Sequence, residues 1–325
     1  MGAKVSFMAL ERLKPLAKKS IPYPARRWLR AQQQRLKQEK QDLFDRIIVR
    51  KLDFTNREGL LNFNFGLFAN HKKRGVTALL RVKNEESKIH YCLKSIYKLF
   101  DEIVFVDNGS EDKTLEVVRD FKHQEDKQDK VKIYFFPFKQ ARFGPEHRDT
   151  PEDSVHSFTY YSNWSLSKCS FDWVCKWDGD MVLRKENREP FRRFLKRIQK
   201  GKKMCWIVYG QTIYRDSASN HFLPRGEING EMRIFPNGFR PRFYKVDLYE
   251  LLKSEPPLEE GQFDGVLFYE LKFVTTDEFS HWSISDIPTE RKKRELENFQ
   301  LVKRNNVSSA RFEKLPSSFL DDQIR

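Results

Sequence analysis

Short apolar runs alternate with amphipathic stretches in the middle of the chain. Residues 76–82, 102–107 and 131–137 are mostly apolar and have the length of strands that are buried in a parallel sheet. Between them, residues 86–100 and 112–121 carry apolar side chains at helical spacing. This strand–helix–strand–helix–strand order predicts a parallel sheet with helices on both of its faces.

The alternation continues toward the C-terminus. The pattern predicts a helix over residues 155–169, followed by a strand over 173–177 that runs directly into Asp178. It then predicts a basic helix over 189–200, a strand over 204–209 and a charged helix over 290–302. After residue 209, and up to His281, the pattern indicates strands and loops without a clear period. The expected fold class is therefore α/β.

The first and last parts of the chain differ from the middle in composition. Residues 26–51 are rich in helix formers, and their apolar side chains form one stripe opposite a strongly basic face. This pattern predicts an amphipathic helix that packs on the main domain, and a basic helix lying on an anionic membrane surface is the alternative. We divide the chain into a basic, partly helical N-terminal extension (1–74), a main domain (75–305, with halves 75–183 and 184–305) and a polar, loose C-terminal tail (306–325).

The composition indicates the chemistry of a partner. The 325 residues include 61 Lys and Arg against 46 Asp and Glu, which gives a net charge of +15. This excess implies an anionic partner, and nucleic acid, acidic lipids and phosphate-bearing small molecules all qualify. The four cysteines form no C-x-x-C pair, so we expect no disulfide framework and a location in the cytoplasm. No apolar run approaches the ~18 residues of a membrane span.

Polar side chains stand at the carboxyl ends of the predicted strands, where open parallel sheets bind their ligands. They are Arg81, Lys83, Glu85, Asp107, Asp178 and Asp180. Asp178 and Asp180 form the only Asp-x-Asp in the chain, and Gly179 between them is expected to let the backbone bend. Two carboxylates on such a turn can hold a hard divalent cation, which can neutralise a diphosphate leaving group. The pair predicts a Mg²⁺ or Mn²⁺ site, and a simple Asp-Gly turn is the alternative.

Two stretches of the sequence resemble signatures of family 2 glycosyltransferases. "RVKNEESKIHYCLKSIYKLFDEIVFVDNGSEDKT" is similar to the opening of that family, and "NWSLSKCSFDWVCKWDGDMVL" is similar to its Asn-bearing helix, strand and D-x-D. The two occur in the family's order and together lie within residues 76–183. The resemblance implies a GT-A fold, a Rossmann-like mixed sheet with flanking helices. It also implies transfer of a sugar from a nucleoside diphosphate donor with inversion at the anomeric carbon.

The resemblance also implies roles for individual residues. Arg81, Lys83 and Glu85 would line the base and ribose pocket, although relatives usually carry apolar, proline or aromatic residues in place of Arg81 and Lys83. Asp107 would hydrogen-bond the base, and Asn163 belongs to the same nucleotide-sugar site. The metal and the diphosphate would be held by Asp178 and Asp180. A turn-forming role for Asp107, a helix N-terminal charge at Glu85 and an ordinary exposed Asn163 are the structural alternatives.

An inverting transfer needs a general base, normally a carboxylate. Beyond residue 183, "GEMRIFP" and "VDLYELL" resemble an arginine-bearing strand and a following glutamate of some relatives. On that alignment Glu250 is the expected base and Asp264 the second choice, while Glu259 and Glu260 stay open. His281, in "DEFSHWS", stands where a histidine of related enzymes completes the metal shell, and a structural or surface histidine is the alternative.

Two other classes of function are alternatives to sugar transfer. A basic nucleic-acid-binding protein would fit the charge, but no recognition motif of that kind is present. A nucleotidyltransferase acting on sugar phosphates would carry a glycine-rich loop after the first strand, where this chain has residues 81–86, Arg-Val-Lys-Asn-Glu-Glu. The family resemblance favours a glycan or lipid-linked acceptor in cell-surface polysaccharide or lipopolysaccharide synthesis. The expected location is the cytoplasm, at the inner face of a membrane that the basic N-terminal segment contacts.

Overall fold

The structure is a computed structural model that describes residues 32–37, 53–65, 72–238, 241–276, 279, 287 and 289–325. The chain divides into two compact units, Met1–Lys51 and Leu52–Arg325. In the first unit the described residues, 32–37, are helical. The rest of the predicted helix over 26–51 lies outside the described residues, and so does His281. The expected domain boundary at residue 75 falls inside a strand of the second unit.

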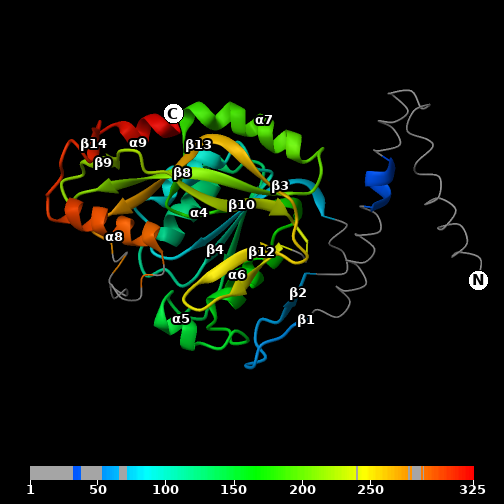
Figure 1. Ribbon diagram of the computed structural model, residues 1–325. Helices are drawn as coiled ribbons and strands as arrows, with labels where there is room; N and C mark the ends of the chain where they lie inside the picture. Colours follow the sequence, from blue (N-terminus) through cyan, green and yellow to red (C-terminus); the bar gives the residue numbers. More distant parts are fainter. Residues whose placement is uncertain are drawn as a thin grey trace, which may run out of the picture. The chain divides into compact units, whose positions relative to one another are not determined.

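Four parallel strands form one half of the central sheet (Figure 1). Their order is β5 (Val131–Phe135), β4 (Glu102–Asp107), β3 (Lys73–Val82) and β6 (Phe171–Trp177). Val82 of β3 pairs with Asp107 of β4, and Leu80 pairs with Trp177 of β6. This register brings the carboxyl ends of β3, β4 and β6 side by side along one edge of the sheet, the edge formed by strand ends. It confirms the predicted parallel arrangement.

The other half makes the sheet mixed. It is built from β10 (Asn229–Pro236), β8 (Cys205–Arg215), β9 (His221–Pro224) and β14 (Phe312–Leu315), in that order. Each of these strands is antiparallel to the next, and β10 is also antiparallel to β6. The long strand β13 (Glu260–Phe273) runs parallel to β8 and antiparallel to the short β7 (Met181–Leu183). Two small hairpins, β1 (Asp53–Phe54) with β2 (Phe63–Asn64) and β11 (Pro241–Lys245) with β12 (Glu250–Ser254), form separate sheets.

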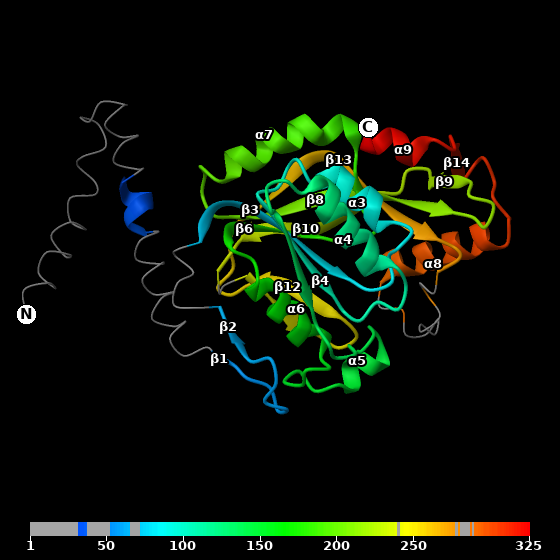
Figure 2. The same ribbon diagram turned by 180° about the vertical axis from the view of Figure 1, so that it is seen from behind.

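Helices cover both faces of the sheet, as Figure 1 and the reverse view in Figure 2 show. One face carries α3 (Ile89–Ile96), α4 (Thr114–Glu125) and α7 (Arg188–Ile198), whose apolar side chains share one core with alternate residues of β3. The opposite face of β3 meets α6 (Phe158–Ser167), because side chains alternate along a strand. Short helical segments, α5 (Pro145–Asp149) and η2 (Lys185–Asn187), lie in the connections. None of the described helices is long and apolar enough to cross a membrane.

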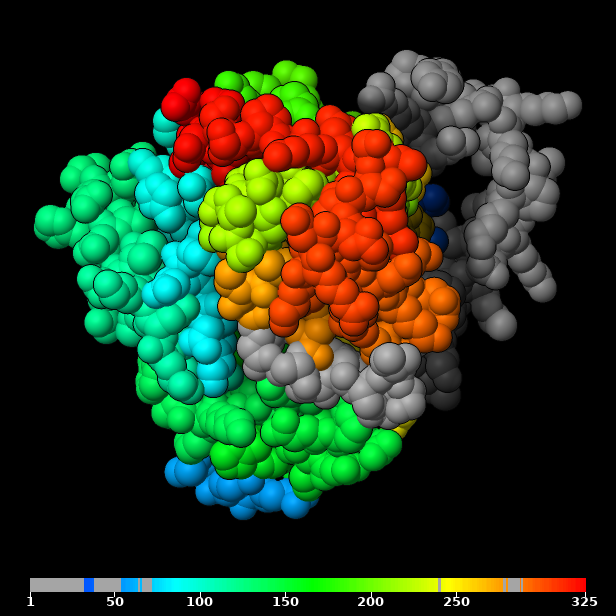
Figure 3. All heavy atoms as spheres, turned by 90° about the vertical axis from the view of Figure 1, so that its left-hand side faces the viewer, coloured from blue at the N-terminus to red at the C-terminus, as the bar shows by residue number. Residues whose placement is uncertain are grey.

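The C-terminal residues are folded, so the expectation of a loose tail is wrong. Helix α8 (Glu290–Lys303) is followed by β14, which pairs with β9, and by α9 (Phe319–Ile324), which packs against α3. Phe312, Leu315 and Leu320 are buried, and these apolar residues hold a segment that is otherwise polar. In Figure 3 this segment, orange to red, lies beside the yellow-green region of β9.

Candidate active site

The strand ends place the predicted polar residues along one edge of the sheet. Asp107 ends β4, and Asp178 follows β6 directly. Asp107 is buried, and its Oδ2 accepts hydrogen bonds from the backbone N–H groups of Gly109 (3.0 Å) and Ser110 (3.1 Å). Gly109 has a φ of +68°, which explains the glycine in this turn. Oδ1 of Asp107 has no hydrogen-bond partner among the described residues, so it can accept a hydrogen bond from a ligand.

Asp178 is half-buried and ionised. Its Oδ2 lies 2.7 Å from Nη1 of Arg233, a buried guanidinium of β10. Burial favours the neutral acid, but the positive charges of Arg233, Lys176 and Arg81 outweigh it and hold the pKa of Asp178 well below its usual range. Asp178 therefore carries a negative charge and can accept hydrogen bonds at any physiological pH.

Asp180 is buried more deeply and has a different environment. Its Oδ2 lies 2.9 Å from Nζ of Lys272, on β13. Burial raises the pKa of Asp180, and the charges of Glu270 and Asp178 act in the same direction, while Lys272 and Lys88 oppose them. The two aspartates of the pair are thus chemically unequal.

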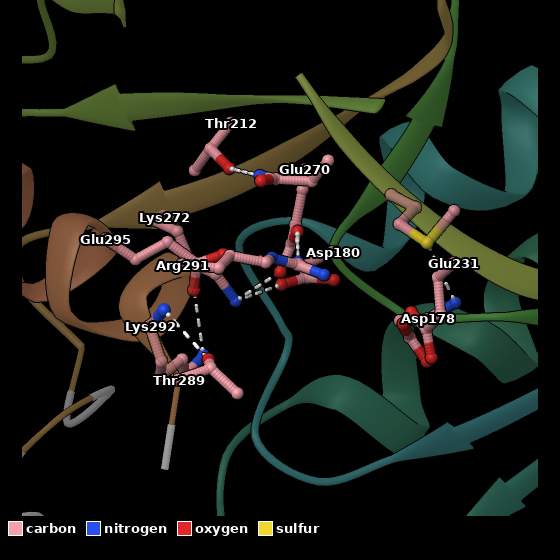
Figure 4. Close-up of polar contacts among 12 residues, drawn as sticks. Asp178, Asp180, Thr212, Glu231, Glu270, Lys272, Thr289, Arg291, Lys292 and Glu295 are labelled. Carbon is pink, nitrogen blue, oxygen red and sulfur yellow. Dashed lines mark hydrogen bonds and ion pairs between the residues drawn. The ribbon is translucent and has the colours of Figure 1, made fainter. Parts of the chain in front are cut away.

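Each aspartate is joined by a cation to a glutamate on a neighbouring strand (Figure 4). Arg233 reaches both Asp178 and, through Nη2 at 2.6 Å, Glu231 of β10. Lys272 reaches both Asp180 and, at 2.9 Å, Glu270 of β13. In each strand the glutamate and the cation are two residues apart, so they lie on the same face. Burial would raise the pKa of Glu270, but Lys272, Arg291 and Lys292 lower it overall.

Glu85 packs against Gly179, the residue between the two aspartates. Nζ of the buried Lys88 lies 2.6 Å from Oε2 of Glu85. Burial and the nearby charge of Asp180 nevertheless raise the pKa of Glu85 to about 7. A Cβ on Gly179 would meet Val82 at 3.1 Å and Glu85 at 3.4 Å, and Gly179 does not have a positive φ. The backbone turns at Gly179 and Asp180, as expected, and the N–H of Met181 bonds to the carbonyl of Asp178 (3.1 Å). Because this turn needs no positive φ, the close approach to Val82 is the feature that favours glycine here.

Arg81 and Glu250 form a buried ion pair. Nη1 of Arg81 lies 2.6 Å from Oε1 of Glu250, and their side chains are 7% and 5% exposed. The guanidinium also lies over the rings of Phe243 (4.5 Å) and Phe158 (5.4 Å) and donates to Ser162 of α6. Oε2 of Glu250 has no hydrogen-bond partner among the described residues. The hairpin β11–β12 thus brings the predicted base to the end of β3.

The remaining predicted residues have other surroundings. Asn163 is buried, and its amide donates to the carbonyl of Phe243 (2.8 Å) and accepts from the N–H of Phe243 (3.1 Å), which ties α6 to β11. Lys83 is exposed, with Nζ 3.9 Å from Glu111. Glu259 pairs with Lys202, and Asp264 is exposed in a surface cleft with Arg193 and Arg197. Glu260 is exposed at the start of β13.

Sequence reasoning missed Lys272, Glu270 and Glu231. The signal that could have found them is a pair of charged triplets in otherwise apolar strands, Glu231-Met-Arg233 and Glu270-Leu-Lys272. Lys and Glu are almost never fully buried unless they are paired, so their presence in a strand pattern indicates a partner. Nothing in the local sequence says that the partners are Asp178 and Asp180.

Asp178 and Asp180 are the residues that the sequence predicts as metal ligands. Within the described parts of the chain, no group of three or more His, Cys, Asp or Glu residues is placed to hold a metal. Both ion pairs of the aspartates use Oδ2, so Oδ1 of Asp178 and of Asp180 is outside these ion pairs. Oxygen donors of this kind suit Mg²⁺ and Mn²⁺, whose remaining positions are commonly filled by water and substrate phosphates.

Comparison with known proteins gives a partial family match. Residues 77–144, about a fifth of the chain, match the family described as Glycosyl transferase family 2. Residues 77–144 are thus similar to that family over a part of the chain. The matched segment includes Arg81, Lys83, Glu85 and Asp107, and the aspartate pair lies beyond it. None of the curated proteins matches the sequence.

Similarity to solved structures is partial. Glucosyl-3-phosphoglycerate synthase from Mycobacterium tuberculosis, in complex with Mn²⁺, UDP and phosphoglyceric acid, is 20% identical over 46% of this chain and 45% of that chain, with a TM-score of 0.29. The same enzyme with Mn²⁺ and UDP-glucose is 22% identical over 46% of each chain, with a TM-score of 0.28. S. aureus TarS 1-349 is 13% identical over 60% of each chain, with a TM-score of 0.35. The chain thus spans about half the length of the mycobacterial structures that it matches.

Proposed function

We propose that this protein transfers a sugar from a nucleoside diphosphate sugar to an acceptor hydroxyl, with inversion at the anomeric carbon. The observation that carries the proposal is the placement of Asp107, with an unpartnered buried Oδ1, and of the ionised Asp178 at the carboxyl ends of β4 and β6, on either side of β3. Nucleotides bind at such edges in open α/β sheets. The family match over the first half of this edge supports the same reaction class.

Donor binding would use the residues at the ends of β3 and β4. Oδ1 of Asp107 would accept an N–H of the base, with its other oxygen held by two backbone donors. Arg81, Lys83 and Glu85 would line the pocket for the base and ribose. Positive charge from Arg81 and Arg233 lies near Asp178, where the diphosphate would bind. Asn163 would act through β11, which it anchors, on the same pocket.

Asp178 and Asp180 would hold Mg²⁺ or Mn²⁺ through their Oδ1 atoms. When bound, the ion neutralises the diphosphate and stabilises it as a leaving group. The ion pairs with Arg233 and Lys272 would keep both carboxylates in place for this role. His281 would complete the metal shell.

Glu250 would take the proton from the acceptor hydroxyl. Its Oε1 is paired with Arg81, and its Oε2 is buried without a hydrogen-bond partner among the described residues, so a change at the pair would expose it to an acceptor. Arg81 would turn toward the anionic donor when the donor binds, because a diphosphate offers a competing partner, and Glu250 would then be released. A freed carboxylate can act as the general base of a single displacement. Asp264 is the second candidate.

We further propose a glycan or lipid-linked acceptor in cell-surface polysaccharide or lipopolysaccharide synthesis. The enzyme would work in the cytoplasm at the inner face of the membrane, where the basic segment 26–51 would contact anionic lipid. The charge excess of the chain supports both the anionic donor and this location.

A thermal-shift panel tests the proposal. UDP, GDP and their sugar derivatives would be added with Mn²⁺ and with EDTA, since a ligand that binds only the folded state raises the melting temperature. We expect a metal-dependent rise with one nucleotide class, which Asp107→Ala abolishes. Glu111→Gln, which changes an exposed acid close to Lys83, is the matched control and should respond like the wild type. No shift with any nucleotide would overturn the proposal.

A further inference from the structure

Helix α7 has two faces of opposite character. Its inner face packs into the core through four buried residues: Phe191, Phe194, Leu195 and Ile198. Its outer face, continued by the following turn, has the same i, i+3, i+4, i+7 spacing but carries exposed cations: Arg193, Lys196, Arg197 and Lys200. Within the part of the chain that the structure describes, none of these four makes an ion pair, whereas the adjacent Arg192 is bonded to Glu189. The outer face of α7 is therefore a compact group of four cations that form no ion pair within the described residues.

We propose that this basic face of α7, defined by Arg193, Lys196, Arg197 and Lys200, docks on membranes that contain anionic phospholipid. The apolar side of the helix is used by the core, so the contact depends on charge alone. Clusters of Lys and Arg on an amphipathic helix are attracted to anionic leaflets, and each cation strengthens partitioning by about fivefold. Such a contact weakens as salt is added.

The structure disfavours several of the other anionic partners. Recognition helices that read duplex DNA also pack one side on their own domain, so duplex DNA is kept as an outcome of the test below. Single-stranded nucleic acid stacks on exposed aromatic rings, and both Phe191 and Phe194 are buried. A protein interface has an apolar, aromatic centre, which the exposed residues of this face do not offer. A lipid headgroup surface needs none of these features.

Neighbouring acids set the limits of the docking face. Asp264 lines a cleft with Arg193 and Arg197 and offsets part of their charge. Glu259 forms an ion pair with Lys202, which lies in the connection between α7 and β8. Lys196 and Lys200 are exposed and are not among the residues of that cleft. The face is distinct from segment 26–51 and from the residues proposed to bind the donor, and it borders Asp264, the second candidate for the general base.

Vesicle sedimentation with the full-length chain tests the inference. Phosphatidylcholine vesicles with and without about 30% phosphatidylglycerol would be compared at low and high salt. We expect binding only to the anionic vesicles, released by salt, and a fall of at least about tenfold in the partition coefficient for the triple variant Arg193→Gln, Lys196→Gln, Arg197→Gln. The matched control, Lys98→Gln, Lys113→Gln, Lys127→Gln, removes three exposed cations elsewhere and should bind like the wild type.

Three results would overturn the inference. The α7 variant could bind anionic vesicles as well as the wild type does, both triple variants could lose binding equally, or a short DNA duplex could bind the α7 face more tightly than the vesicles. All substituted side chains are exposed, so an unchanged melting temperature confirms that each variant is folded. The nucleotide-induced thermal shift of the α7 variant should equal that of the wild type, which separates failure here from failure of the proposed reaction.

Discussion

Nζ of Lys272 lies 2.9 Å from Oδ2 of Asp180 and 2.9 Å from Oε1 of Glu270. One buried ammonium group thus compensates two buried carboxylates, and the buried guanidinium of Arg233 pairs with the half-buried Asp178 and Glu231. Removing a single member of such a group leaves a charge with no water to solvate it. The aspartate pair is consequently fixed by residues of β10 and β13, not only by its own turn.

Asp180→Asn should abolish sugar transfer and leave the fold intact. The change removes the negative charge that the proposed metal site needs, while Lys272 keeps its contact with Glu270. The checks are a transfer assay with radiolabelled donor and a circular dichroism melt. Asp120→Asn, an exposed acid of α4, serves as the matched control. A fully active Asp180→Asn protein would remove the metal role assigned to this residue.

Lys272→Met should destabilise the protein by about 3–5 kcal/mol, because Asp180 and Glu270 would then be buried without their shared cation. The measurement is the free energy of unfolding from urea titration. The double variant Lys272→Met, Asp180→Asn should recover part of the loss, because it contains one fewer uncompensated charge. If the two substitutions are simply additive, Lys272 and Asp180 are not coupled as described.

Glu250→Gln should retain the nucleotide-induced thermal shift and slow transfer by at least about 100-fold, since an amide cannot accept the acceptor's proton. It should also lower the melting temperature, because Arg81 would lose its buried counter-charge. Transfer is therefore measured well below the melting temperature of the variant. Normal transfer would mean that the base lies elsewhere, and Asp264→Asn is then the next variant to assay.

Glu85 should make stability depend on pH. Its pKa is about 7 in the folded chain against an ordinary value of 4.5, so the folded state holds the proton more tightly than the unfolded state. The free energy of unfolding should therefore fall as the pH rises from about 4.5 to about 7, by up to about 3 kcal/mol, and level off above that.

The measurement is urea unfolding of the wild type and of Glu85→Gln across this pH range. As the pH rises, the unfolding free energy of the wild type should fall relative to that of Glu85→Gln, because glutamine does not titrate. A difference that stays constant with pH would contradict the raised pKa. Glu86→Gln, an exposed neighbour, should show the wild-type dependence.

The parallel half of the sheet was predictable because its signals are local. β3, α3, β4, α4, β5, α6 and β6 each appear in the sequence as an apolar run or a helical period close to the observed bounds. The C-terminal segment was not predictable in this way. It has polar composition, and a few apolar side chains, such as Phe312 and Leu320, gain their importance only from the surfaces that they meet.

By itself, the sequence determined the order of strands and helices, and it placed Asp107, Asp178 and Asp180 at strand ends, because periodicity and turn residues act over a few neighbouring positions. The tertiary structure alone decided which charges meet. Lys272 reaches Asp180 across 92 positions of the chain, and Arg81 reaches Glu250 across 169. These pairings follow from strand order and register, which depend on how the whole sheet buries its apolar faces.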